Sequence, residues 1–153
     1  MADGSPPRLQ QRGVFDEYHV VEARAAGASS LTLVAELVDA NTLGNLISAT
    51  QRNRMTAIVR VQNRDELHAT LEVCPPVIEL GKRDPASGTL DLGHLEALRA
   101  EIPSTCRVLF YNRLRTLDEA KAVAALKPNA VLISPHLLAE ANAVPQLREI
   151  FAN

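Results

Sequence analysis

Aromatic residues are scarce in this chain of 153 residues, and tryptophan is absent. Only 3% of the residues are aromatic although 46% are hydrophobic, so the apolar share comes mainly from Ala, Leu and Val. The chain is nevertheless long enough to bury a core of its own. β-Branched residues favour strands, whereas Ala and Leu favour helices. The composition therefore predicts a globular domain in which strands alternate with helices.

Charge of one sign and long apolar runs are also missing. The formal net charge is only −2, which removes the long-range attraction expected of a dedicated DNA-binding protein. No apolar run approaches the roughly 20 residues that span a bilayer. Residues 1–7 contain no apolar core of a signal peptide. We therefore expect that DNA is not a partner of this chain and that no segment of it spans a membrane.

Cysteine and histidine are too few and too scattered to build a metal site. Cys74 and Cys106 are far apart and belong to no C-x-x-C pair, so a disulfide or metal framework has no support. The four histidines show no metal-binding spacing. We expect two buried free thiols, an intracellular protein in a reducing compartment (the cytoplasm or an organelle interior), and no cofactor.

A regular alternation of strand and helix patterns begins after a short lead-in. Residues 1–13 are rich in Pro, Gly, Gln and Arg, and are expected to be flexible. Residues 14–153 are expected to form a single, incomplete domain. Strands are predicted at residues 30–38, 57–61, 77–80, 106–111 and 130–134, each followed by a helix.

Local signals mark several of the helices. Residues 16–27 are predicted to be helical, with Tyr18, Val21 and Ala25 on one face. Asp39 is expected to cap a helix whose apolar stripe comprises Leu43, Leu46, Ile47 and Thr50. Capping boxes are predicted at Asn63 with Glu66 and at Thr116 with Glu119. Residues 136–152 are predicted to form a helix that is interrupted near Pro145.

This alternation predicts an α/β fold of about five parallel strands joined by right-handed crossovers. An open doubly wound sheet and part of a barrel both fit. No G-x-G-x-x-G or G-x-x-x-x-G-K-[ST] motif follows a strand, which argues against a nucleotide-binding sheet. A complete eight-stranded barrel needs about 250 residues. The chain is therefore expected to lack three strand–helix units of a barrel.

Three motifs favour the barrel. Asp16-Glu17-Tyr18 with residues 22–28 (EARAAGA) is similar to a D-P-Y…E-A-R…G-A-D helix. Arg83-Asp84, with Leu90-Asp91-Leu92 after it, is similar to an N-N-R-D-L…D-L loop, and residues 129–133 (NAVLI) to a G-A-D-A-V-L-V-G strand. With this spacing the sequence resembles the second half of indole-3-glycerol phosphate synthase. The resemblance implies a partial (β/α)8, TIM-barrel-like fold and an ancestor that closed the indole ring in tryptophan biosynthesis.

The resemblance fails at the positions that carry the chemistry of that family. Gln11 stands where the family has a lysine acid, and an amide cannot donate a proton as an ammonium can. Arg60 replaces a glutamate, and Gly81 replaces an asparagine. Residues 110–113 (FYNR) replace S-E-S-G, and Ser134-Pro135 replaces a phosphate-binding Gly-Ser, losing an N–H to proline. Only Arg83 remains. No catalytic residue is therefore assigned.

A basic rim is nevertheless expected at the ends of the strands, where barrels of this kind place their sites. The predicted substrate- or anion-binding residues are Arg60, Lys82, Arg83, Asn112, Arg113 and Ser134. A structural interpretation stays open, in which Glu36 or Glu79 balances the charge of Arg60 in the sheet. A lone loop arginine such as Arg83 also often pairs with an acid.

Three functions follow as hypotheses. The first is a non-catalytic synthase-like protein that acts as a structural or interaction subunit of a larger assembly. The second is a carbon–carbon lyase of the synthase type, or a related phosphate-sugar enzyme, completed by another chain. The third is an anion- or RNA-binding module that uses the basic rim. In each case a partial barrel exposes sheet edges, so a protein partner or a homo-oligomer is expected to cover them, with a phosphate-bearing ligand as a further partner.

Overall fold

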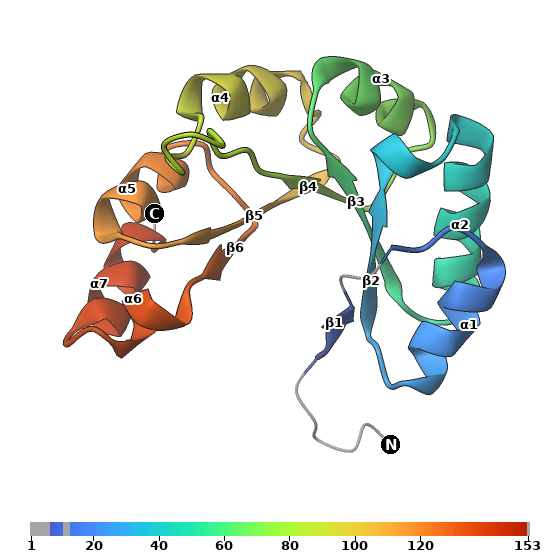
Figure 1. Cartoon of the computed structure of the whole chain (residues 1–153), viewed down its shortest axis with the longest axis horizontal. Coiled ribbons are helices and arrows are strands. Elements are labelled where there is room, and N and C mark those ends of the chain that lie inside the picture. The colour runs from blue at the N-terminus through green and yellow to red at the C-terminus, as the bar shows by residue number, and fades with distance from the viewer. Residues whose placement is uncertain (1–6, 11–12, 153) are drawn as a thin grey trace. The chain divides into compact units, whose positions relative to one another are not determined.

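The computed structural model describes residues 7–10 and 13–152. In these residues six strands alternate with helices along the chain (Figure 1). The strands are β1 (Leu9–Gln10), β2 (Ser30–Val34), β3 (Thr56–Val61), β4 (Val77–Leu80), β5 (Arg107–Leu114) and β6 (Ala130–Ile133). The helices are α1 (Glu17–Ala25), the 3-10 turn η1 (Ala35–Leu37), α2 (Ala40–Arg52), α3 (Arg64–Glu72), α4 (Leu92–Glu101), α5 (Leu117–Ala124), α6 (Pro135–Ala139) and α7 (Ala143–Ile150).

The chain divides into two compact units, Met1–Ile78 and Glu79–Asn153. In the first unit, β1, β2 and β3 pair in parallel and in chain order, with Ser30 opposite Thr56 and Val34 opposite Arg60. Apolar side chains of β2 and β3, such as Leu31, Leu33 and Val59, are fully buried. The parallel pairing confirms the prediction that helices connect the strands as crossovers.

The helices of the first unit begin where the sequence places polar caps. The side chains of Asp16, Asp39 and Asn63 accept hydrogen bonds from the backbone N–H three residues later. Such caps satisfy backbone donors that the helix itself cannot use. The apolar stripe predicted for α2 is confirmed, since all of its members are buried: Leu43, Leu46, Ile47 and Thr50.

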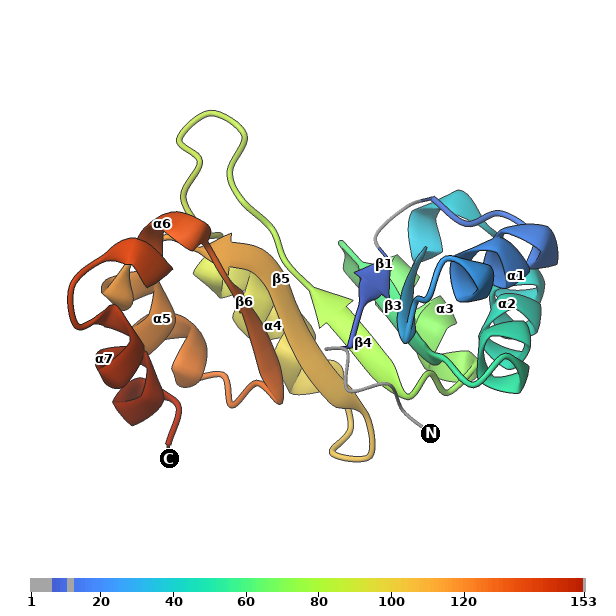
Figure 2. The same ribbon diagram turned by 90° about the horizontal axis from the view of Figure 1, so that it is seen from below.

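The second unit contains β5 and β6, which pair in parallel, and helices α4 to α7. Helices α5 and α7 lie side by side, and α6 contacts α7 (Figure 2). The core is formed by buried side chains of β5 and of the helices, including Phe110, Leu95, Val123 and Leu147. The alternation predicted from the sequence thus holds in both units.

Several boundaries differ from the sequence predictions. β1 lies inside the segment predicted to be a flexible lead-in, and it adds a strand to the predicted five. The strand predicted at residues 30–38 ends at Val34, where η1 begins. The break in the last helix lies at residues 140–142, where Asn142 has a φ of +62°, and Pro145 sits in the first turn of α7. Proline is tolerated there because first-turn N–H groups have no partner within the helix.

Two predictions of burial are wrong. In α1 the buried residues are Val20 and Ala23, whereas Tyr18 and Val21 are exposed. Cys74 is also exposed: α3 ends at Glu72, and Cys74 follows with a φ of +48°. Cys74 therefore lies beyond the end of α3, and its thiol is not buried as expected. No helix in the described part of the chain is long and apolar enough to cross a membrane.

Candidate functional site

The best-defined polar cluster of the second unit is built on the loop that follows β4. Arg83 forms an isolated antiparallel bridge with Leu90, which closes residues 83–90 into a hairpin-like loop. Asp84 accepts hydrogen bonds from the N–H groups of Ala86 and Ser87, at 2.8 and 2.7 Å. The N–H of Ser87 is the largest cause that lowers the pKa of Asp84. These contacts fix the loop and hold the backbone from which the Arg83 side chain extends.

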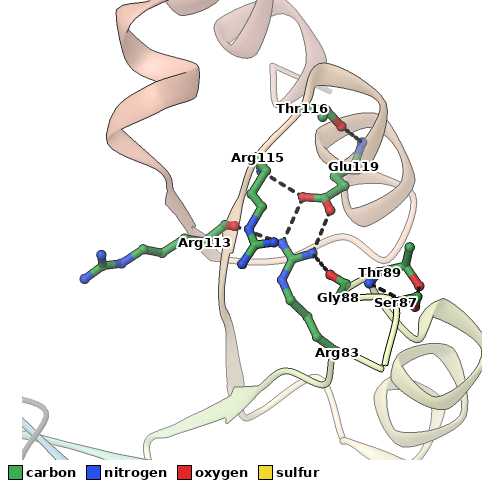
Figure 3. A network of polar contacts seen from close by, with 8 residues as sticks. All are labelled: Arg83, Ser87, Gly88, Thr89, Arg113, Arg115, Thr116 and Glu119. Carbon is green, nitrogen blue, oxygen red and sulfur yellow. Dashed lines mark hydrogen bonds and ion pairs between the residues drawn. The ribbon is translucent and has the colours of Figure 1, made fainter. Parts of the chain in front are cut away.

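The guanidinium of Arg83 is bonded on all four terminal N–H positions (Figure 3). Nη1 donates to Glu119 Oε1 at 2.7 Å and to the carbonyl of Gly88 at 2.9 Å. Nη2 donates to Glu119 Oε2 and to the carbonyl of Arg113, both at 3.0 Å. Because each terminal nitrogen has two hydrogens, neither retains a free donor for a ligand. The fork thus ties the loop after β4 to β5 and to α5.

Glu119, in the first turn of α5, accepts two of these hydrogen bonds from Arg83. Thr116 caps the helix by accepting the N–H of Glu119, and Oε2 of Glu119 accepts the N–H of Arg115 at 2.7 Å. The side chains of Arg83 and Glu119 are 15% and 21% exposed. The hydrogen bond from Arg83 is the main cause that lowers the pKa of Glu119, against a smaller effect of burial in the opposite direction. A bidentate, partly buried pair of this kind is among the stronger ionic contacts.

The end of β5 is irregular. Its pairing with β6 shifts register between Phe110 and Leu114, so that residues 111–113 of β5 lie opposite the single residue Leu132 of β6. A β-carbon at Gly81 would lie 2.7 Å from two ring carbons of Tyr111 and 2.9 Å from Oδ1 of Asn112. Bulges of this kind re-aim side chains and are common beside active sites.

The structure distributes the predicted anion-binding residues unevenly. Arg60 lies in β3 of the first unit and is half-buried, whereas the other five belong to the second unit. Lys82 and Arg113 are exposed, and in Figure 3 the Arg113 guanidinium points away from the Arg83 ion pair. Ser134 is buried, and its hydroxyl accepts the N–H of Leu137 at 3.2 Å as the cap of α6.

The remaining candidates are the two acids suggested as partners of Arg60, the position of the family's lysine, and a metal site. Glu36, the acid suggested for Arg60, accepts a hydrogen bond from the Gln62 side chain at 3.1 Å. Glu79, the other suggested acid, is completely buried in β4. Gln11, which stands at the position of the family's lysine, lies outside the described residues. Among the residues described, no group of His, Cys, Asp or Glu is arranged to hold a metal ion.

Comparison with known proteins identifies the family. The model of the indole-3-glycerol phosphate synthase family matches residues 5–150. The chain belongs to this family. Its relatives include an indole-3-glycerol phosphate synthase of Roseiflexus sp. (32% identity, covering 94% of this chain and 54% of the relative) and one of Dehalococcoides mccartyi (30%, covering 94% and 56%). The chain thus spans about half the length of these synthases.

Solved structures show the fold but are distant in sequence. 3-Hexulose-6-phosphate synthase from Salmonella typhimurium matches with a TM-score of 0.74 at 16% identity, covering 94% of this chain and 71% of that one. A lactate oxidase from Pediococcus acidilactici matches with a TM-score of 0.67 at 13% identity, covering 97% and 55%. Together with the alternating strands and helices, these matches confirm the predicted partial (β/α)8 fold.

Sequence reasoning missed two features of the site. Glu119 was predicted as part of a capping box, but nothing in the local pattern predicts a partner 36 residues away. The contact of Tyr111 with Gly81 was also missed, although a signal was present. The synthase-like pattern has a side chain at position 81 where this chain has none, and this chain has a large ring at position 111.

Proposed function

We propose that this chain is a non-catalytic member of the indole-3-glycerol phosphate synthase family and acts as a structural or interaction subunit of a larger assembly. The observation that carries the proposal is the state of Arg83, the one residue retained among the compared positions that carry the chemistry of the family. Its four terminal N–H groups bind acceptors of the chain itself. A ligand that binds either terminal nitrogen would have to displace one of these acceptors, so we infer that the terminal nitrogens of Arg83 serve the fold.

The end of β6 supports the same conclusion. Ser134 uses its hydroxyl to cap α6, and Pro135, the first residue of that helix, has no N–H to offer. α6 is also short, extending only from Pro135 to Ala139. The turn that follows β6 therefore presents few backbone donors to an anion.

An interaction role is supported by β6 itself. Within the described residues β6 lies at the end of the sheet and is paired with β5. Its apolar side chains Val131, Leu132 and Ile133 are only half-buried, although parallel strands are usually covered on both faces. β6 contains no lysine or proline, the residues that commonly protect an edge from pairing with another chain.

A cavity beside β6 adds to this surface. It has a volume of about 440 Å³ and is lined by Ala130 and Val131 of β6 together with Ile150 and Phe151 at the end of α7. A strand added to the edge of β6 would be able to place an apolar side chain there. We therefore propose that β6 pairs with a strand of another polypeptide, a second copy of this chain being the first to test.

The activity is tested by incubating the purified chain with the carboxyphenylamino-deoxyribulose phosphate that the synthase resemblance implies. A full-length relative, such as the Roseiflexus synthase, serves as the positive control. No indole-product fluorescence above background is expected from this chain. Turnover above background that disappears in Arg83→Met would contradict the proposal.

The interaction is tested by sedimentation velocity over a range of concentrations. Leu132→Lys places a charge on β6, whereas Val144→Lys places the same charge on an apolar side chain of α7 that is already 43% exposed. We expect association of the wild type and of Val144→Lys, and monomers of Leu132→Lys. Wild-type monomers at every concentration would exclude self-association.

A second candidate function is a synthase that another polypeptide completes. It is favoured by the relatives, which are named synthases and are about twice as long as this chain. The same assay distinguishes the two, if it is repeated with the part of the Roseiflexus protein that this chain does not cover. Turnover only in the mixture would favour the second function.

A further inference from the structure

Two consecutive side chains of β5 converge on one point above Gly81. The position that a β-carbon of residue 81 would occupy is 2.7 Å from Cδ1 and Cε1 of Tyr111 and 2.9 Å from Oδ1 of Asn112. All three residues belong to the second unit. In a regular strand, consecutive side chains point to opposite faces of the sheet. The convergence is therefore a special feature of this strand.

The register shift of β5 explains the convergence. Phe110 is opposite Val131, but Leu114 is opposite Ile133, so three residues of β5 face a single residue of β6. The extra length bends the strand and lets neighbouring side chains reach the same side. Tyr111 and Asn112 lie within this irregular segment.

Gly81 is the residue that makes the arrangement possible. Real β-carbons do not approach other atoms to 2.7 Å, and the nearest atoms here belong to a rigid ring. Gly81 is itself buried. The Tyr111 ring thus occupies the space that a side chain at position 81, or a small molecule beside β4, would otherwise fill.

The same place contains a polar group with unused bonding capacity. Nδ2 of Asn112 is buried, and no described residue accepts a hydrogen bond from it. A buried amide donor without an acceptor costs free energy, so such groups are rare away from functional sites. Its natural complement is an acceptor, and an anionic acceptor forms the stronger bond.

We propose that Tyr111 is a built-in occupant of a ligand site whose donor is the amide of Asn112. The ring lies on Gly81 and closes the site to any molecule of its own size. The ligand class that fits after removal of the ring is a small aromatic anion, with its ring in the place of the phenol and its carboxylate accepting from Asn112. This inference deepens the proposed function, because it explains how the strand ends of the second unit are closed to substrate.

The interlock between the two positions is tested by placing Gly81→Ala in two backgrounds. In the wild type, the added methyl group meets the ring, and we expect the unfolding equilibrium constant to rise about tenfold or more. In a Tyr111→Ala background the same substitution is expected to have only a small effect. Equal effects in both backgrounds, or failure of both Gly81→Ala proteins to fold, would overturn the proposal.

The ligand site is tested with benzoate as the probe. We expect Tyr111→Ala to bind benzoate about tenfold or more tightly than the wild type, as measured by isothermal titration calorimetry. Phenol, which has the same ring but a weaker acceptor, is expected to bind less tightly than benzoate. Adding Asn112→Leu, which keeps the size of the side chain and removes its donor, is expected to abolish this preference.

The outcomes separate the inference from the proposed function. Benzoate binding to the wild type as tight as to Tyr111→Ala, or a preference that survives Asn112→Leu, would overturn the inference. Neither experiment measures turnover. Synthase activity in the wild type would therefore contradict the proposed function without altering the result of the substitution at Gly81.

Discussion

Two helices of this protein begin with the same device and use it differently. α3 begins with Asn63 and has Glu66 three residues later, whereas α5 begins with Thr116 and has Glu119 in the same place. Glu66 accepts the N–H of Gln62 and the side-chain amide of Asn63, at 2.8 and 2.6 Å. Both of these donors lie within four residues. The first box is therefore a local structure.

The second box has the same local part and adds a distant one. Glu119 accepts the N–H of Arg115, which corresponds to that of Gln62, but its remaining capacity is taken by the guanidinium of Arg83. Glu119, which takes part in capping the start of α5, thus also holds the loop that follows β4. This difference explains the role we infer for Arg83: it is retained in the sequence, and its guanidinium binds Glu119 of α5.

The largest difference in stability is expected between the alanine variants of the two glutamates, each made separately. Glu119→Ala leaves the partly buried charge of Arg83 without its partner, and we expect a loss of about 3 kcal/mol in the free energy of unfolding. Glu66→Ala, the matched control, removes only local hydrogen bonds and is expected to cost about 1 kcal/mol. Chemical denaturation measures both. Equal losses would mean that the contact with Arg83 adds nothing.

The pH dependence of stability sharpens the same comparison. The pKa of Glu119 is lowered from its ordinary value of 4.5, mainly by the hydrogen bond from Arg83. A lowered pKa in the folded state stabilises the protein above the unfolded pKa, and this contribution is lost as the pH falls through the folded pKa. The gap in unfolding free energy between wild type and Glu119→Gln should therefore be constant near neutral pH and narrow below about pH 4.5. A gap that widens on acidification would contradict the assignment.

The caps themselves should be alike. Thr116 and Asn63 each accept one backbone N–H from the residue three positions later, at 3.1 and 2.9 Å. Substituting either by alanine is expected to cost about 1 kcal/mol. Thermal unfolding of Thr116→Ala and Asn63→Ala measures the two side by side. A clearly larger loss at Thr116 would show that the cap also positions Glu119 for Arg83.

Much of the fold was predictable from sequence because its signals are local. Residues 77–80 are found as a strand with the predicted bounds, and Asp39 caps α2 as its pattern indicates. β1 was missed because two residues are too few to show a periodicity. The predicted face of α1 was wrong, because its members Tyr18 and Val21 are exposed, whereas the structure buries Val20 and Ala23.

The site was less predictable because it depends on contacts between distant segments. The sequence indicated that Arg83 was retained and that an arginine in a loop is often paired, but not that Glu119 is the partner. Likewise, the convergence of Tyr111 and Asn112 on Gly81 depends on a register shift that no residue pattern announces. The sequence located the ends of the strands, but it did not predict which side chains fill the space beside Gly81.

The central claim, that Arg83 is a structural residue bound to Glu119, is tested most directly by a double-mutant cycle. Arg83→Met, Glu119→Leu and the double variant are compared with the wild type by chemical denaturation at neutral pH. We predict a coupling free energy of about 1.5 kcal/mol or more, with the double variant more stable than Glu119→Leu alone. A coupling below about 0.5 kcal/mol, within the error expected for independent sites, would contradict the account.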